Sequence, residues 1–414
     1  MDTGVRDFIF PSKIGAGSRA LEHLPFDLGG FGAQRPMVVC TEALDSKGGL
    51  KPLESAFKGS GLTYGVYAVE DMPTLETVRE VWGHYNEGGF DAVIAVGGGA
   101  VTDVGKCLAV AAQGGPEALR ELLAGGGTAS ATAPFAWVPT LELTGREAAP
   151  EAALGNQVIR GTSLCPNLIA VDPRMLQGQA GAGLVEAGLG ALAAALCLYE
   201  PVEANPLALP YARLTARQVV AGLIPLLTRA EAPRGRLSRL FGTGGPREEE
   251  VAFVTAMAVS GGLLPEARKS LTFVLADVLS PAAGTSREVL AAVLLPTVLE
   301  YISRVRGQDL SGLLSALADL DLLCATPVNQ RAEAALAMVR ETINRLWIFS
   351  EARLPRSLAE AGLEKETLQG LCEQAAAMAE GWQRQEVESL LLSAWDGTRP
   401  DPNNQPIRAT QEVS

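Results

Sequence analysis

The sequence predicts an α/β region that contains a parallel sheet, followed by an all-α region. Up to about residue 173, short apolar strands alternate with helical stretches, which is the pattern of a parallel α/β sheet. Beyond about residue 174, β-branched runs fade and Ala/Leu-rich segments with helical spacing dominate. A length of 414 residues suits two domains or more. We therefore expect an α/β domain at 1–174, an all-helical domain at 175–396 and a polar tail at 397–414.

The individual elements follow from apolar runs and helical spacing. The predicted strands are residues 8–10, 37–40, 64–69, 91–96, 136–139 and 168–171, with a helix at 75–86 among them. The predicted helices of the second domain are residues 184–199, 212–229, 248–263, 287–305, 330–346 and 365–383. Residues 230–247 are rich in Gly, Pro and Arg, which predicts a loop.

Residues 91–106, DAVIAVGGGAVTDVGK, are the most specific stretch of the chain. A buried β-branched strand runs into Gly97, Gly98 and Gly99 and then into a helix. Without Cβ atoms, these glycines allow a sharp turn and let a phosphate group approach the free N–H groups at the start of the helix. Thr102 and Asp103 lie within one helical turn of such an anion, and Lys106 within two. The pattern predicts a phosphate-binding turn.

Other interpretations of this stretch fit less well. A P-loop is excluded because Ala100 stands at its first glycine position and Cys107 follows the lysine. The usual dinucleotide fingerprint is excluded because Thr102 stands at its last glycine. A near match to that fingerprint at 15–20 has the spacing of an ordinary strand-to-helix turn. A tight turn without a ligand remains the alternative for Gly97 to Gly99.

The glycine stretch resembles the G-G-G-S-x-x-D-x-x-K signature of the iron-containing alcohol dehydrogenase family, within the dehydroquinate-synthase-like superfamily, with Ala100 in place of the serine. Other segments resemble the family in the same order. They are its opening strand and turn at 8–17, its P-T-x-x-x-T-G-S-E loop at 139–147, its closing strand and D-P at 166–173, and its L-L-P at 294–296. The resemblance therefore extends over nearly the whole chain.

The resemblance implies a cofactor site for NAD, with NADP not excluded. Besides Gly97, Gly98, Gly99, Thr102, Asp103 and Lys106, it implies an opposite wall made by Thr140, Thr144 and Gly145. Glu42 stands where the family has an acidic residue at the adenosine ribose. A carboxylate there accepts hydrogen bonds from the 2′-hydroxyl and repels a 2′-phosphate, which favours NAD. An exposed loop glutamate is the alternative.

The family's metal ligands are missing. Members hold Fe²⁺ or Zn²⁺ through one aspartate and three histidines, and the resemblance places Gly190, Ala194, Phe273 and Arg287 at these four positions. None of these side chains suits such a metal. The chain has only two histidines, His23 and His84, both far from these positions, and six cysteines without a C-x-x-C pair, which we interpret as small buried hydrophobes. We expect no bound metal.

Charge that develops on a substrate oxygen then needs another partner. Arg287 and Lys269 lie in the region that corresponds to the lost site, and an arginine can hold an oxyanion or a carboxylate. A solvated or ion-paired arginine at a helix start is the alternative. Glu142 and Arg146 replace small residues in the loop that lines the cofactor cleft of the family.

Two hypotheses remain open. In one, the protein is a nicotinamide-dependent oxidoreductase that acts without metal on an alcohol, aldehyde or keto compound. In the other, it is a non-catalytic relative, or pseudoenzyme, that serves as a binding or assembly scaffold. The retained glycine turn favours the first hypothesis, and the four lost ligands favour altered or lost chemistry.

Composition limits the partners. A net charge of −13, a pI near 4.9 and dispersed basic residues argue against nucleic-acid binding. The sequence lacks a secretory signal pattern and a long apolar run, so we expect neither export nor membrane insertion. Unpaired cysteines suit a reducing compartment, which predicts a cytoplasmic protein with a small-molecule substrate. The resemblance implies a homodimer or a higher homo-oligomer.

Overall fold

The computed structural model describes residues 8–69, 73–124, 132–176, 182–200, 205–231, 248–350, 353–379 and 381–397. It divides into two compact units. The α/β unit comprises Ile9–Leu184 and Ala221–Gly262, and the helical unit comprises Met1–Phe8, Val185–Val220 and Leu263–Ser414. The division at Leu184 lies ten residues beyond the expected boundary at 174. The expected loop at 230–247 and tail at 397–414 lie almost wholly outside the described residues.

The α/β unit is built on a six-stranded parallel sheet, which confirms the predicted fold class. The strand order is β1-β8-β5-β4-β2-β3, and each neighbouring pair is parallel. The strands are β1 (Lys13–Ala16), β2 (Pro36–Cys40), β3 (Gly65–Ala68), β4 (Ala92–Val96), β5 (Phe135–Val138) and β8 (Leu168–Val171). The helices of residues 9–184 are α1 (Ala20–Gly30), α2 (Glu42–Ser46), α3 (Lys51–Phe57), α4 (Leu75–Glu87), α5 (Ala100–Gly114) and α6 (Glu117–Leu123).

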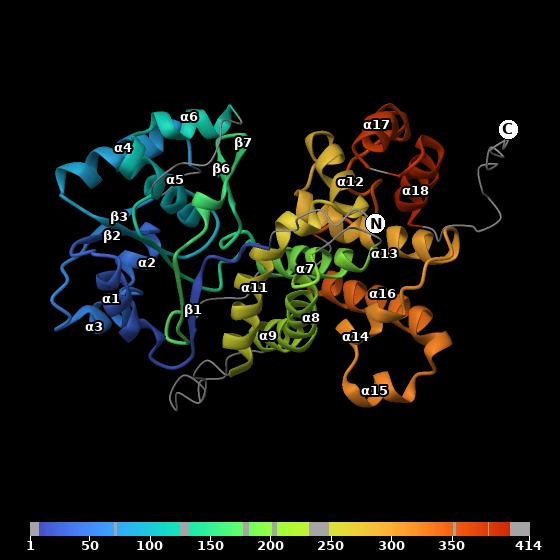
Figure 1. The fold of residues 1–414 in the computed structure, drawn as a ribbon, viewed down its shortest axis with the longest axis horizontal. Helices are drawn as coiled ribbons and strands as arrows, with labels where there is room; N and C mark the ends of the chain where they lie inside the picture. Colours follow the sequence, from blue (N-terminus) through green and yellow to red (C-terminus); the bar gives the residue numbers. More distant parts are fainter. Residues whose placement is uncertain are drawn as a thin grey trace. The chain divides into compact units, whose positions relative to one another are not determined.

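Two hydrophobic cores cover the two faces of the sheet, because successive side chains of a strand point to opposite faces. In β2, Val38 and Cys40 join the core that contains residues of α1 and α3. Met37 and Val39 join the core formed with α4 and α5. Figure 1 accordingly shows α1 and α3 on one side of the strands and α4 and α5 on the other. The sheet is thus buried on both faces, as parallel sheets are.

Two details of this unit differ from the prediction. Residues 8–10 form no strand, and β1 begins at Lys13 instead. The aromatic side chains of that run pack against helices: Phe8 stacks on Tyr211, and the ring of Phe10 fills the space beside Gly262. An antiparallel hairpin of β6 (Glu151–Leu154) and β7 (Gln157–Arg160) was not predicted.

The described residues of the segment 221–262 include α9 (Ile224–Glu231) and the greater part of α11 (Glu248–Ala267), and a π-helical turn at Val219–Leu223 precedes α9. Glycines allow α11 to pack closely. A Cβ at Gly261 would lie 2.7 Å from the backbone nitrogen of Ala149, and a Cβ at Gly262 would lie 2.3 Å from the ring of Phe10. These contacts explain why residues 248–262 group with the sheet, although the chain around them is helical.

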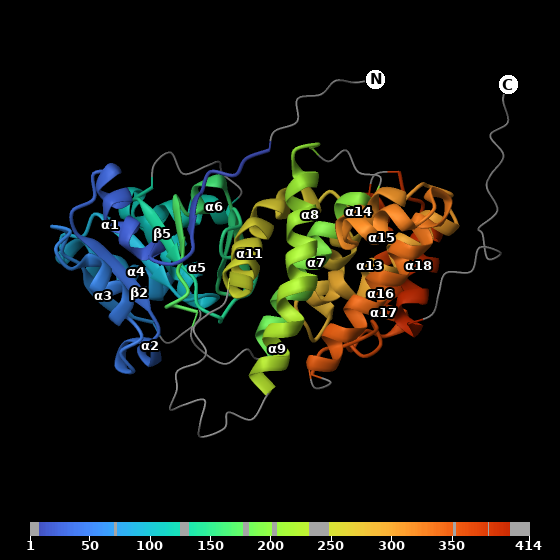
Figure 2. The ribbon, with the colours of Figure 1, turned by 90° about the horizontal axis from the view of Figure 1, so that it is seen from below.

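The second unit is wholly helical in its described residues, as predicted. Figure 2 shows its helices. They are α7 (Ala182–Leu196), α8 (Ala208–Gln218), α12 (Leu271–Leu279), α13 (Arg287–Arg304), α14 (Leu314–Leu317), α15 (Leu320–Ala325), α16 (Arg331–Phe349), α17 (Lys365–Met378) and α18 (Arg384–Asp396). Helices α12, α14, α15 and α18 were not predicted. α13 packs against α12, α16 and α18 and is the buried centre of this unit. Within the described ranges, no helix combines the length and apolar character needed to cross a bilayer.

Candidate functional site

The glycine turn lies between β4 and α5, at the carboxyl edge of the sheet. β4 ends at Val96 and α5 begins at Ala100, which confirms the predicted strand, turn and helix. Gly97 has a φ of 136° and Gly99 a φ of 53°, conformations that residues with a Cβ rarely adopt. The carbonyl oxygen of Gly97 accepts a hydrogen bond from Trp137 Nε1 at 2.7 Å, which attaches the turn to the neighbouring strand β5.

Several N–H groups of this turn are available to a ligand. In the part of the chain that the structure describes, no acceptor faces the backbone N–H groups of Gly98, Ala100, Val101 and Thr102. Gly98, Gly99 and Ala100 are only partly buried. Unpaired N–H groups at the start of a helix, together with the helix dipole, attract an anion such as a phosphate. The turn therefore has the donors that a dinucleotide pyrophosphate requires.

The loop from Thr140 to Glu147 folds directly over the turn. A Cβ on Gly98 would lie 1.7 Å from the carbonyl oxygen of Glu142, so no other residue fits there without movement of the backbone. Thr140 is buried and its hydroxyl accepts a hydrogen bond from the N–H of Glu142 at 3.3 Å. Gly145 has a φ of 84°. The three predicted residues of the opposite wall thus belong to one loop that touches the turn.

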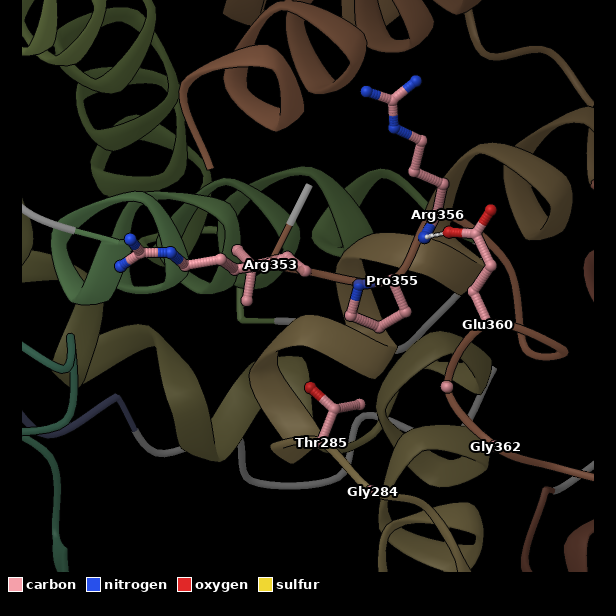
Figure 3. A pocket seen from close by; sticks show the side chains of 9 residues that line it. Gly284, Thr285, Arg353, Pro355, Arg356, Glu360 and Gly362 are labelled. Carbon is pink, nitrogen blue, oxygen red and sulfur yellow. Dashed lines mark hydrogen bonds between the residues drawn. The ribbon is translucent and has the colours of Figure 1, made fainter. Parts of the chain in front are cut away.

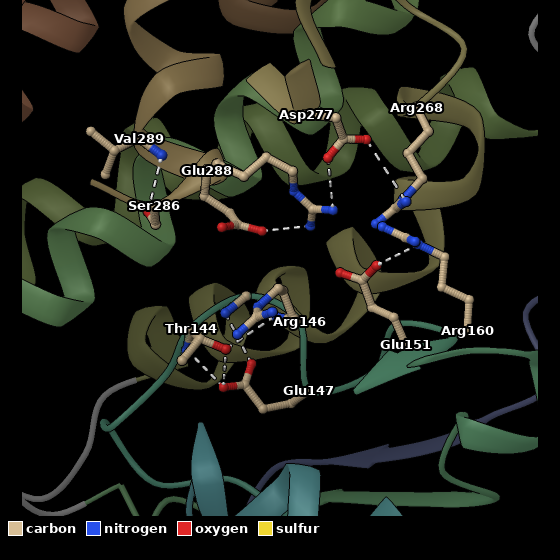
Figure 4. Close-up of polar contacts among 12 residues, drawn as sticks. Thr144, Arg146, Glu147, Glu151, Arg160, Arg268, Asp277, Ser286, Glu288 and Val289 are labelled. Carbon is tan, nitrogen blue, oxygen red and sulfur yellow. Dashed lines mark hydrogen bonds and ion pairs between the residues drawn. The ribbon is translucent and has the colours of Figure 1, made fainter. Parts of the chain in front are cut away.

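Glu147, at the end of this loop, was not predicted as a site residue. The residue is 3% exposed, and its carboxylate joins the two walls. Oε1 accepts hydrogen bonds from the N–H of Gly99 at 3.2 Å and from the N–H and hydroxyl of Thr144 at 2.7 and 2.9 Å, while Oε2 accepts one from the N–H of Gly145 at 2.9 Å. Figure 4 shows the Thr144 and Glu147 contacts. In the sequence, Glu147 could have been singled out as the last residue of PTLELTGRE, the segment that resembles the family's loop.

The side chains of Thr102, Asp103 and Lys106 point into the protein. The Thr102 hydroxyl donates to the carbonyl oxygen of Gly97 at 3.5 Å. Lys106 Nζ is fully buried and donates to the carbonyl oxygens of Arg146, Ala149 and Glu151 at 2.8, 2.9 and 2.6 Å. These side chains therefore brace the turn and its facing loop, and their predicted contact with a cofactor remains a prediction.

Burial shifts both charged groups of this pair toward neutrality. It raises the pKa of Asp103 to about 6, against the opposing effect of the Lys106 and Arg146 cations. It lowers the pKa of Lys106, and the nearby Asp103 carboxylate opposes that shift. The two groups stabilise each other's charged forms in a region that water does not reach.

Glu42 lies at the same edge of the sheet as the glycine turn. β2, β4 and β5 are adjacent parallel strands, so their carboxyl ends meet at one edge, where ligands bind in open α/β sheets. Thr41 follows β2 and caps α2 by accepting from the N–H of Leu44 at 3.3 Å. Glu42 is the first residue of α2 and is exposed. Its position suits a contact with a ribose at this edge.

In the helical unit, the region of the lost metal site contains a cluster of four charged residues, which we call the charge cluster: Arg268, Asp277, Arg287 and Glu288. Arg287 begins α13, with Nη2 2.6 Å from Glu288 Oε1 and Nη1 3.4 Å from Asp277 Oδ1. Arg268 Nη1 lies 3.9 Å from the other oxygen of Asp277. The Arg287 guanidinium also lies 5.9 Å from the centroid of the Phe273 ring. Figure 4 shows these ion pairs.

Lys269, the second predicted catalytic residue, has a different environment. Its ammonium group lies 2.8 Å from Glu266 Oε1 and its side chain is about half exposed, at 49%. Glu266 is itself buried and accepts a second hydrogen bond from the N–H of Asn205 at 2.9 Å. Of the two predicted catalytic cations, only Arg287 is a member of the charge cluster.

The residues at the four metal-ligand positions do not fit Fe²⁺ or Zn²⁺. Gly190 and Ala194 lie on α7, Phe273 lies on α12, and Arg287 is already paired with carboxylates. A Cβ at Gly190 would lie 2.8 Å from the Cβ of Glu288, so an aspartate has no room there. Across the described ranges, no three His, Cys, Asp or Glu side chains gather closely enough to hold a metal ion.

The histidines and cysteines are distributed largely as expected. His23 and His84 are both exposed. Cys40, Cys107, Cys197 and Cys372 are buried, Cys165 is partly buried, and Cys324 is exposed. For Cys324 the prediction of a buried side chain was wrong, because α15 has no buried residue.

A cavity of about 680 Å³ lies in the helical unit beside the loop that precedes α13. Gly284 and Thr285 line one side, and residues 353–356 and 360–362 line the other. Figure 3 shows the guanidinium groups of Arg353 and Arg356 pointing in different directions. The N–H of Arg356 donates to the Glu360 carboxylate at 2.7 Å. The charged groups do not converge on a common point.

Comparisons with known proteins agree with the fold. The family model described as iron-containing alcohol dehydrogenase matches residues 11–173. Long-chain-alcohol dehydrogenase 1 of Geobacillus thermodenitrificans is 24% identical over 413 residues, covering 96% of this chain and 99% of the relative. Maleylacetate reductase of Burkholderia cepacia is 24% identical over 412 residues, covering 95% and 99%.

Solved structures share the same fold. The alcohol dehydrogenase from Oenococcus oeni matches with a TM-score of 0.72 at 19% identity, covering 94% of this chain and 100% of that chain. The NADH-dependent butanol dehydrogenase A of Thermotoga maritima matches with a TM-score of 0.67 at 16% identity, covering 94% and 98%. The chain is therefore similar to the iron-containing alcohol dehydrogenase family, by the family model over residues 11–173 and by sequence and fold over nearly its whole length, and the four positions that the resemblance assigns to metal ligands carry no metal-binding side chain.

Proposed function

We propose that the protein is a nicotinamide-dependent oxidoreductase that acts on an alcohol, aldehyde or keto compound without a bound metal. One observation carries the proposal: among the described residues no acceptor faces four N–H groups of the glycine turn, which lies at the carboxyl edge of the sheet beside the Thr140 to Glu147 loop. Such donors are of use to an anionic ligand and cost stability if nothing binds them. The structurally similar butanol dehydrogenase A of Thermotoga maritima is described as NADH-dependent.

The chain's own residues would hold NAD in defined ways. The open N–H groups of Gly98, Ala100 and Val101 would bind the pyrophosphate, and Thr140, Thr144 and Gly145 would form the opposite wall. Glu42 would accept hydrogen bonds from the adenosine ribose and repel a 2′-phosphate. When bound, the cofactor supplies the site that accepts or donates a hydride.

Arg287 is the better candidate for the electrophilic role that a metal has elsewhere in the family. It is nine-tenths buried, always cationic and held in place by two carboxylates and an aromatic ring. A fixed guanidinium can donate hydrogen bonds to an oxyanion or a substrate carboxylate. Lys269 is a weaker candidate because it is half exposed and paired with Glu266.

Binding and turnover with matched variants test the proposal. NADH should bind more tightly than NADPH in a fluorescence titration, and tighter NADPH binding would contradict the role of Glu42. Activity should be measured with a panel that includes a long-chain alcohol, lactaldehyde and maleylacetate, the compounds in the relatives' names. It should persist with strong chelators, and elemental analysis of untagged protein should find less than one equivalent of iron or zinc.

The Arg287→Ala variant tests the electrophilic role. It should lower the rate by roughly a hundredfold, the usual scale for losing one charge-stabilising donor. NADH affinity should change little because the proposed cofactor contacts lie in the α/β unit. Lys269→Ala, at the more exposed cation, should have a smaller effect. Activity that chelators abolish would mean that the metal ligands are misplaced.

A non-catalytic scaffold is the second candidate, and one observation favours it. The charges of the cluster balance, with two arginines against two carboxylates, and Glu288 fills the space beside Gly190. Ion pairs of this kind also occur in buried networks that have a structural role and bind no ligand. If the protein is a scaffold, no member of the panel will consume NADH and Arg287→Ala will not alter NADH binding.

We further propose a homodimer or higher homo-oligomer in the cytoplasm that binds a small molecule and neither nucleic acid nor membrane. The family resemblance supports the oligomer, and the net charge of −13 supports the absence of nucleic acid. Sedimentation velocity at two protein concentrations tests the oligomeric state, and a monomer at both would contradict it.

A further inference from the structure

Glu147 and Lys106 tie the loop of residues 140–151 to the glycine turn and to α5 from opposite sides. We infer that Glu147 is a positioning residue of the cofactor site, whose carboxylate holds the Thr144 wall at the distance from the glycine turn that a dinucleotide needs. The inference rests on the proposed function, since it concerns the same cofactor.

The contacts of Glu147 span both walls. Oε1 accepts from Gly99 on the turn and from the N–H and hydroxyl of Thr144 on the loop, and Oε2 accepts from Gly145. Gly99 and Glu147 are 48 residues apart, so this carboxylate is a long-range link and not a local turn contact. Four donors on one buried carboxylate compensate for its desolvation, because hydrogen bonds to a charged acceptor are stronger than neutral ones.

The carboxylate takes one N–H of the turn and leaves the others open. It occupies the N–H of Gly99, whereas those of Gly98, Ala100 and Val101 have no acceptor among the described residues. Because all four bonds hold Glu147 on the protein side, its 3% exposed side chain is not a free charge facing a ligand. Its bond with the Thr144 hydroxyl also fixes the orientation of that hydroxyl, which the proposal places on the cofactor wall.

Lys106 completes the attachment from α5. Its fully buried ammonium group donates to three carbonyl oxygens of the same loop, those of Arg146, Ala149 and Glu151. The loop is therefore held by two groups: the Glu147 carboxylate, which accepts hydrogen bonds from N–H groups, and the Lys106 ammonium group, which donates to carbonyl oxygens. Close packing of Gly98 on the Glu142 carbonyl shows how little space separates the loop from the turn.

The experiment compares wild type with Glu147→Gln, which keeps the shape but replaces one accepting oxygen by an NH₂ group that faces an N–H donor. Glu121→Gln is the matched control, because Glu121 is an exposed glutamate on α6 of the same unit. Three quantities are measured: the Kd of NADH by fluorescence, the Kd of adenosine, which lacks the pyrophosphate, by saturation-transfer NMR, and hydrogen exchange of peptides covering 97–105 and 140–147.

Glu147→Gln should raise the Kd of NADH by roughly tenfold or more, the equivalent of losing one charge-assisted hydrogen bond. The Kd of adenosine should stay within about twofold, exchange should rise in both peptides, and Glu121→Gln should match wild type. Equal or tighter NADH binding by Glu147→Gln would overturn the inference, because the carboxylate would then be irrelevant to the pyrophosphate or in competition with it. Parallel weakening of adenosine would also overturn it and indicate a general structural role.

The same measurements separate this inference from the proposed function. A wild-type protein that does not bind NADH refutes the proposed function, and the positioning role falls with it. A wild-type protein that binds NADH, with a Glu147→Gln variant that binds equally well, refutes only the role of Glu147.

Discussion

The glycine turn of the α/β unit and the charge cluster of the helical unit differ in how their polar groups are paired. At the turn, N–H groups of Gly98, Ala100 and Val101 are left without an acceptor in the described structure. In the cluster, Arg287 lies between two carboxylates, and Glu288 fills the space beside Gly190. One region has N–H donors that no described acceptor faces, and in the other the two arginines are paired with carboxylates. The resemblance to the family is therefore uneven along this chain: the glycine turn keeps the geometry of an anion-binding turn, whereas the four positions assigned to metal ligands carry other side chains.

The comparison would be sharpened most by Lys106→Met, which removes the buried cation behind the turn. Methionine fills a similar volume but removes the ammonium donor of three carbonyl oxygens, two of which are in buried hydrogen bonds, so we expect a loss of ~3 kcal/mol or more in the free energy of unfolding. Urea unfolding followed by circular dichroism measures it. Lys58→Met, at an exposed lysine, is the control and should stay within about 0.5 kcal/mol of wild type. A small effect of Lys106→Met would mean that the loop does not depend on this cation.

Gly98→Ala tests whether the turn is as tight as its geometry indicates. The new Cβ would lie 1.7 Å from the Glu142 carbonyl oxygen, so the turn or the loop must move. We expect NADH affinity to fall by roughly a hundredfold, or ~2.7 kcal/mol. Gly83→Ala in α4, where a Cβ meets nothing within 4 Å, should leave binding unchanged and add slightly to helix stability. Normal NADH binding by Gly98→Ala would contradict the proposed role of the glycine turn, because the turn would then not be the binding surface.

Glu200→Gln is directed at the helical unit, where a buried carboxylate supports the start of α12. Glu200 accepts hydrogen bonds from the N–H of Leu271 and from the hydroxyl of Thr272, at 2.8 and 2.5 Å. Burial nevertheless raises its pKa from 4.5 to about 7. The folded protein thus binds a proton at this group more tightly than the unfolded chain does, so its stability should fall as the pH rises from about 4.5 to 7.

The size of that fall is on the order of 3 kcal/mol, and Glu200→Gln should remove it because the amide does not titrate. Thermal unfolding of both proteins between pH 4.5 and 7.5 measures the difference in slope. Asp103, whose pKa is also raised, contributes a slope of the same sign in both proteins and serves as an internal reference. Parallel slopes for the two proteins would show that Glu200 stays ionised in the fold.

Much of the α/β unit could be predicted because its strands are short, apolar and bounded by glycine or proline. The turn at Gly97 to Gly99 is the best example, since the apolar strand, the three glycines and the helix follow one another directly in the sequence. The β6–β7 hairpin was missed although its signal was present. Gly155 and Asn156 form a two-residue connection between the strands, but the alanines of β6 hide the strand.

Other features depend on contacts between distant residues. Helix α12, LTFVLADVL, contains enough β-branched and aromatic residues to obscure a helix, and its start is stabilised by Glu200, about seventy residues earlier. The position of Glu147 could be found from the family's loop motif, but its role could not, because that depends on the fold bringing it to Gly99. The same holds for Lys106, whose hydrogen bonds to the facing loop could not be read from its spacing in the sequence.

The packing of Gly190 against Glu288 has a consequence for the history of this lineage. A Cβ at position 190 would meet the Cβ of residue 288 at 2.8 Å, so an aspartate cannot return there unless residue 288 becomes glycine or the helices separate. Removal of Glu288 first would take a carboxylate from Arg287. Either order of substitution passes through a less stable intermediate before any metal ligand is regained. The two positions therefore constrain each other: an aspartate at position 190 and the Glu288–Arg287 ion pair cannot be accommodated together unless the surrounding structure moves.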